Sequence, residues 1–197
     1  MRKSQVFLLI PLVVWGFLPP TAFSKESVFS EMAHAITARP HSAPADGTIE
    51  VAFSPQAGAT ELVVKAISSA KKSILVAAYS FTSKPIAQAL VDAHKRGIDV
   101  KVVVDKSQKS ARYTSATFLA NMGIPTRVDS QHAIQHNKFM VIDREHVETG
   151  SFNYTSAAEQ RNAENAMVIW NNPRLATTYA DNWLVHWEHS EPYAARY

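Results

Sequence analysis

The chain has 197 residues, of which 46% are hydrophobic, and it carries 20 basic and 17 acidic side chains but no cysteine. The lack of cysteine excludes disulfides, thiolate metal sites and a cysteine nucleophile. A formal net charge of +3 is too small to indicate a polyanionic partner, and the length suits one domain with a substantial core.

Residues 1–24 have the pattern of a secretory signal peptide. The basic pair Arg2 and Lys3 precedes the apolar run Val6–Leu18, and small residues predict cleavage after Ser24. Cleavage there leaves 173 residues with a formal net charge of +1. A retained membrane anchor is the alternative, but the run is short against the ~20 residues of a spanning helix and contains proline and glycine. We therefore expect a periplasmic or secreted protein without a membrane span.

The rest of the chain predicts a polar N-terminal segment followed by one domain. Residues 25–47 contain Pro40 and Pro44 and read as a linker after a short helix at Ser27–Ile36. In residues 48–197, apolar and alternating runs predict strands and 3.6-residue periodicity predicts helices. The expected strands are Thr48–Phe53, Ser73–Ser80, Asp99–Val104, Pro125–Val128, Phe139–Ile142, His146–Thr149 and Ala163–Trp170, and the expected helices are Ala57–Lys71, Ser83–Lys95, Lys109–Met122 and Pro173–Ser190. This order indicates an α/β fold with a mixed sheet flanked by helices.

One stretch, His136 to Asn153, carries most of the chemistry. His136 and Lys138 are two residues apart at the start of a predicted hairpin, so their side chains should leave the same face. A nucleophile or base would thus lie beside a positive charge. Asn153, just past the return strand, could add an amide donor, and this combination suits a phosphate.

The spacing His136-x-Lys138-x4-Asp143-x6-Gly150-Ser151-x-Asn153 resembles the HKD signature of the phospholipase D superfamily. Size, signal peptide and a single motif make the chain similar to the small bacterial Nuc-type endonucleases. The resemblance covers the chain from about Thr48 and implies one family half-unit. Most superfamily members have two motifs with the site between them, so the resemblance implies a homodimer that shares one site.

The resemblance also implies roles for the motif residues. One His136 would become a phosphohistidine and its mate would act as acid and base. Lys138 and Asn153 would hold the phosphate oxygens. Glu164 would orient the histidine and Ser151 could assist. Asp143 and Gly150 would support the architecture, and no step requires a metal or other cofactor.

Other candidate sites are weaker. His132 with His136, and His186 with His189, have spacings that metal pairs use, but the first would need a helix where a loop is expected and the second lacks a third ligand. We predict ordinary polar histidines and no metal site. The residues Lys106, Lys109 and Arg112 follow a strand end and could track a nucleic-acid backbone, or could form a solvated loop.

The sequence therefore predicts a metal-independent phosphodiesterase that cleaves DNA, with RNA as a further substrate to consider. A site that grips phosphate and sugar has little sequence preference. Two alternatives remain: a phospholipase D acting on lipid head groups, which would use identical phosphate-handling residues, and a non-catalytic phosphate- or nucleic-acid-binding envelope protein.

Overall fold

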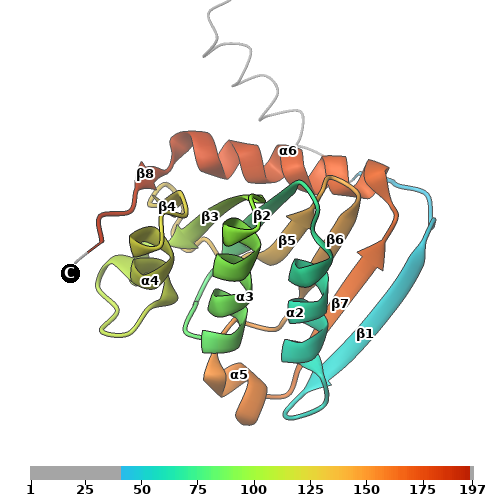
Figure 1. Cartoon of the computed structure of the whole chain (residues 1–197), viewed down its shortest axis with the longest axis horizontal. Helices are drawn as coiled ribbons and strands as arrows, with labels where there is room; N and C mark the ends of the chain where they lie inside the picture. Colours follow the sequence, from blue (N-terminus) through green and yellow to red (C-terminus); the bar gives the residue numbers. More distant parts are fainter. Residues whose placement is uncertain (1–40, 196–197) are drawn as a thin grey trace, which may run out of the picture.

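The computed structural model describes residues 41–195, and within them eight strands form one mixed sheet (Figure 1). The strand order is β1-β7-β6-β5-β2-β3-β4-β8. Strands β2, β3 and β4 are parallel, and every other neighbouring pair is antiparallel. The strands are β1 (Thr48–Ser54), β2 (Ser73–Ala78), β3 (Asp99–Asp105), β4 (Thr126–Asp129), β5 (Lys138–Ile142), β6 (His146–Gly150), β7 (Glu164–Trp170) and β8 (Glu191–Pro192). The expected mixed sheet flanked by helices is confirmed.

Helices cover both faces of this sheet and create two apolar layers (Figure 1). On one face, α2 and α3 pack over side chains such as Ile74, Val76 and Met140. On the other face, α6 covers Val103 and Phe139. Because successive strand residues point to opposite faces, the continuous apolar runs of β2 and β5 supply both layers. The helices are α2 (Ala59–Ser69), α3 (Lys84–Lys95), α4 (Ser115–Asn121), α5 (Ser156–Gln160) and α6 (Pro173–His189), with a 3-10 turn η1 (Lys106–Lys109).

The expected helix over Lys109–Met122 is wrong in its first part. The chain makes the short turn η1, runs on without regular structure, and begins α4 only at Ser115. Thr114 caps α4 by accepting a hydrogen bond from the backbone N–H of Ala116. The Thr114 hydroxyl also donates to the buried side chain of Gln108, 2.8 Å away. These side-chain bonds fix a non-helical segment that periodicity could not reveal.

The remaining predicted elements agree with the structure within a few residues. Three residues, Asp143–Glu145, connect β5 to β6. Asp143 and Arg144 each have φ of 57° and form the centre of a turn closed by the hydrogen bond from the Glu145 N–H to the Ile142 carbonyl. The short elements α5 and β8 were not predicted. The predicted signal peptide and the helix at 27–36 lie outside the described residues. No helix in the described part is both long and apolar enough to cross a bilayer.

A buried acid fixes the loop that follows β6. Glu148 and Tyr154 are almost fully buried, and the Tyr154 hydroxyl donates to a Glu148 carboxylate oxygen 2.6 Å away. The carbonyl of Tyr154 in turn accepts the backbone N–H groups of Thr82 and Ser83. Burial raises the pKa of Glu148 to about 8, against the opposing effect of the Tyr154 hydrogen bond.

This pair makes the stability pH-dependent. Between pH 4.5 and about 8, the folded state keeps a proton on Glu148 that the unfolded state releases. The free energy of unfolding should therefore fall as pH rises through this window, by at most about 1.4 kcal/mol per pH unit.

Glu148→Gln should remove this dependence, because the amide cannot titrate yet still offers an acceptor to Tyr154. Thermal unfolding of the variant should vary less than that of the wild type between about pH 5 and about pH 8. Glu61→Gln, at an exposed position of α2, is the control and should keep the wild-type slope. Equal slopes for wild type and Glu148→Gln would contradict the buried-acid interpretation.

Candidate active site

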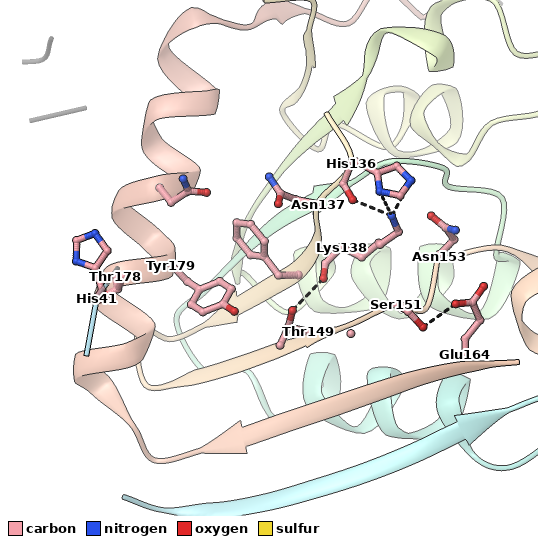
Figure 2. A pocket seen from close by; sticks show the side chains of 13 residues that line it. His41, His136, Asn137, Lys138, Thr149, Ser151, Asn153, Glu164, Thr178 and Tyr179 are labelled. Atoms are coloured by element: carbon pink, nitrogen blue, oxygen red, sulfur yellow. Dashed lines mark hydrogen bonds between the residues drawn. The ribbon is translucent and has the colours of Figure 1, made fainter. Parts of the chain in front are cut away.

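A pocket of about 700 Å³ opens where β5 and β7 begin and β6 ends (Figure 2). Because these strands are antiparallel, their alternating ends meet at one edge of the sheet. The lining combines the motif residues with side chains of α6 and one residue before β1: His41, His136, Asn137, Lys138, Phe139, Thr149, Gly150, Ser151, Asn153, Glu164, Thr178, Tyr179 and Asn182. The structure thus brings together His136, Lys138, Ser151, Asn153 and Glu164.

His136 and Lys138 are in contact, as their spacing predicts (Figure 2). The Lys138 ammonium donates to the His136 carbonyl at 2.7 Å and lies 3.0 Å from Nδ1 of the imidazole. The ring of Tyr79 packs against the imidazole, with centroids 4.6 Å apart, and lies 5.3 Å from the Lys138 nitrogen. Burial lowers the pKa of Lys138, while the charge of Glu164 opposes that shift. Lys138 therefore places a partly desolvated ammonium beside an exposed imidazole.

At Gly150, strands β6 and β7 approach closely, and this contact brings Ser151 next to Glu164. A Cβ atom on Gly150 would lie 2.2 Å from the carbonyl oxygen of Asn165, so only glycine fits. The next residue, Ser151, donates its hydroxyl to Glu164 at 2.6 Å. Asn162 donates to the other carboxylate oxygen of Glu164 at 3.2 Å.

Glu164 does not take the partner that the resemblance implies. No hydrogen bond joins Glu164 to His136 in the single chain over residues 41–195, and the carboxylate bonds Ser151 and Asn162 instead. Ser151 and Asn162 thus hold Glu164 at the rim of the pocket.

Asn153 has unused hydrogen-bonding capacity. Its Oδ1 atom is buried and, among the described residues, makes no hydrogen bond. Buried polar atoms are normally paired, so this oxygen has an acceptor position that a ligand or water could fill. Imidazole, ammonium and amide groups facing one pocket can attack, neutralise and hydrogen-bond a phosphoryl group.

Asp143 lies at the far end of β5 from His136. Its carboxylate accepts the backbone N–H groups of Lys71, Lys72 and Ser73 at 2.7–2.9 Å. Burial would raise the pKa of Asp143, but these hydrogen bonds outweigh it and lower the pKa. The contacts tie the hairpin turn to the start of β2, which agrees with the supporting role expected for this residue.

The basic residues after β3 do not reach the pocket. Lys106 donates to the carbonyl of His132, and Lys109 forms an ion pair with Glu191. Arg112 stacks on exposed Tyr113 beside a different hollow, of about 570 Å³. A role for these residues in substrate binding therefore depends on a ligand that extends well beyond the pocket.

The sequence analysis missed four residues that line the pocket, and Tyr79, which packs against His136: the lining residues are His41, Thr178, Tyr179 and Asn182. Tyr79 follows the buried strand β2, and the rule that ligand sites lie past strand ends could have found it. The α6 residues carry no such signal, because the helix periodicity marks them only as half-buried.

Comparison with known proteins shows which family and which solved structures this chain is similar to. Residues 63–187 match the family model described as cardiolipin synthase, PLD-like domain. The phospholipase D of Rickettsia bellii (strain RML369-C) is 38% identical over 136 residues, which are 69% of this chain and 67% of that protein. The crystal structure of Nuc from Salmonella typhimurium, a phospholipase D family member, has 47% sequence identity and a TM-score of 0.73, and the match covers 75% of this chain and 99% of that one. The mitochondrial cardiolipin hydrolase of Danio rerio is 32% identical over 125 residues, which are 63% of this chain and 55% of that protein.

A scaffold role for Asp143 can be tested by two substitutions. Asp143→Ala removes the acceptor of three backbone N–H groups. Because the carboxylate is partly exposed, the loss in the free energy of unfolding at neutral pH should be only roughly 1–2 kcal/mol. Asp143→Asn keeps one oxygen and should cost less. Since the pKa of Asp143 is lowered on folding, its contribution exists above about pH 4 and disappears below it.

Chemical denaturation of both variants at neutral and at acid pH measures this effect. If Asp143→Ala unfolds at the same denaturant concentration as the wild type at neutral pH, the proposed anchor does not contribute.

Proposed function

Because this chain belongs to the phospholipase D superfamily, and is therefore a phosphodiesterase, we propose that it hydrolyses DNA phosphodiester bonds with little sequence preference. The observation that carries the proposal is the pocket in which His136, Lys138 and Asn153 converge. The likeness to Nuc over nearly that whole chain favours a nuclease. A site that binds phosphate and sugar rather than base edges would have little sequence preference.

We propose that the reaction proceeds in two steps at a site shared by two chains. One His136 ring nitrogen attacks phosphorus and forms an N–P bond, while the bond from phosphorus to the leaving oxygen breaks. The partner's His136 gives its proton to that oxygen and then removes a proton from the water that cleaves the phosphohistidine. A single chain carries one such imidazole at the motif, so the chemistry requires a second copy.

In this mechanism Lys138 and Asn153 would stabilise the charge on the non-bridging oxygens. The Lys138 ammonium is already fixed by the His136 carbonyl, so little reorganisation accompanies the reaction. Asn153 would donate to a phosphate oxygen through its Nδ2 atom, because the amide oxygen can only accept. Glu164, held by Ser151 and Asn162, places a negative charge whose effect opposes the lowering of the Lys138 pKa by burial.

A phospholipase activity is the second candidate, because similar proteins are named phospholipase D and mitochondrial cardiolipin hydrolase. The phosphate-handling groups would be the same for a lipid. Export to the periplasm or beyond remains the prediction made from residues 1–24.

The function can be tested on purified protein in excess EDTA. We expect cleavage of plasmid and single-stranded DNA, because ammonium and imidazole groups supply the charge and proton transfers. His136→Ala should lower the rate by at least about 1,000-fold while the protein stays folded. His94→Ala, a histidine of α3 outside the pocket, is the control and should keep the rate.

RNA, phosphatidylcholine vesicles and cardiolipin vesicles serve as parallel substrates. Lipid hydrolysis without DNA cleavage would replace the first proposal by the second candidate. Complete loss of DNA cleavage on chelation would contradict the metal-independent mechanism.

The shared site can be tested with hybrid dimers. Wild-type and His136→Ala chains carrying different affinity tags are co-expressed, and the mixed species is isolated by two successive affinity steps. A two-histidine site predicts that this hybrid has less than about 1% of wild-type turnover, because one step always lacks its imidazole.

Hybrids between wild-type and His94→Ala chains provide the matched control and should remain active. Half the wild-type turnover in the His136→Ala hybrid would show that each chain works alone. Light scattering of the wild type should report a dimer.

A further inference from the structure

A second group of ligating side chains lies apart from the pocket-lining residues. Asp129 ends β4, His132 follows in the next loop, and His186 and His189 lie in the last turn of α6. By sequence spacing alone, His132 and His136 form one candidate metal pair. His186 and His189 form another, for which the sequence offers no third ligand. The structure gives a different grouping, in which His132 joins the two α6 histidines around the Asp129 carboxylate.

The geometry of this cluster is close to that of a metal centre. The Asp129 Oδ2 atom lies 2.9 Å from Nδ1 of His132, 2.8 Å from Nδ1 of His186 and 3.1 Å from Nε2 of His189. One ligand atom from each of the four residues lies within 4.8 Å of the others. Ligands of tetrahedral zinc are about 3.3 Å apart, so small side-chain rotations would close the group around an ion.

Hydrogen bonds within the cluster do not give every imidazole nitrogen a partner. The other oxygen of Asp129 accepts the backbone N–H of Gln131, so all three imidazoles compete for Oδ2. His189 Nε2 is buried and, within the described part of the chain, makes no hydrogen bond despite its 3.1 Å distance from Oδ2. A cation between the rings would give this nitrogen a partner.

We propose that Asp129, His132, His186 and His189 bind a transition-metal cation, with Zn²⁺ as the best match. Three imidazoles and one carboxylate suit zinc and its neighbours, whereas Mg²⁺ and Ca²⁺ prefer oxygen ligands. Four protein ligands leave no open position, which is the pattern of a structural site rather than a catalytic one. The His132 side chain is 48% exposed and provides the route by which an ion enters.

The proposed metal site would stabilise the segment that leads from β4 into β5, the strand that begins at Lys138. His186 contacts the amide of Asn137 at 3.5 Å through its second ring nitrogen, and Asn137 lies between His136 and Lys138 in the chain. With an ion on Nδ1, the second ring nitrogen of His186 carries the proton and donates, so an Asn137 amide turned to present its oxygen would orient the metal-bound histidine. Zinc would thus clamp the end of α6 to the segment that leads from β4 into β5, without entering the phosphate chemistry.

The test uses the full mature chain without a histidine tag, stripped with EDTA and dialysed into chelator-free buffer. Isothermal titration with Zn²⁺ should show one ion per chain, confirmed by elemental analysis after gel filtration. At a free Zn²⁺ concentration about 100-fold above Kd, the Tm should rise by about 5–10 °C. Mg²⁺ at the same concentration should cause no rise, and bound Co²⁺ should give the strong visible bands of four-coordinate nitrogen and oxygen ligation.

Variants separate this site from adventitious binding. His132→Ala removes the most exposed ligand and should leave the stripped protein folded, with Zn²⁺ affinity at least about 10-fold weaker. The double variant His132→Ala/His189→Ala should lose both the stoichiometric ion and the Tm rise. His94→Ala should bind Zn²⁺ as the wild type does.

Absence of stoichiometric Zn²⁺ in the wild type, or an unchanged Tm rise in the double variant, would overturn the proposal. Neither result depends on whether the protein cleaves DNA.

Discussion

The register of the antiparallel strands β5, β6 and β7 is the constraint on which the site depends. Phe139, Thr149 and Met167 lie in one row across these strands, so the strand ends carrying the motif meet at one edge of the sheet. Gly150 permits the closest approach, because a side chain there would collide with the backbone of β7. A shift of one residue would reverse the face of every side chain and separate Ser151 from Glu164.

Polar anchors hold the segments that regular structure does not reach. After β6, the buried pair Glu148–Tyr154 fixes the loop carrying Ser151 and Asn153, and before β5 the backbone of Gln135 donates to Asp105 at 2.8 Å. These anchors cost desolvation energy, as the raised pKa of Glu148 shows. In exchange, the anchors fix the positions of the pocket side chains. An imidazole and an ammonium must be held within a fraction of an ångström to act together.

The electrostatics of the pocket follow from the same arrangement. Lys138 belongs to a strand buried on both faces, so its stem lies in the core while its nitrogen emerges beside His136 and Tyr79. Glu164 supplies the opposing charge that keeps the pKa of Lys138 from falling further. A phosphate entering this pocket would exchange water for groups that are already oriented, which is the main source of catalytic power in such sites.

The sequence by itself determined the fold class, most strand and helix positions, and the pairing of His136 with Lys138. These features depend on local periodicity, and two residues two apart on a strand share a face whatever the rest of the chain does. Tertiary structure alone decided the features that depend on particular side-chain contacts. Glu164 bonds Ser151 rather than His136, Gln108 and Thr114 shorten the expected helix, and the three histidines gather around Asp129. The pairing of β6 with β7 brings Ser151 to Glu164, which is 13 residues away in the chain. The packing of α6 against the sheet, which no local pattern encodes, brings His186 and His189 to Asp129 across 57 and 60 residues.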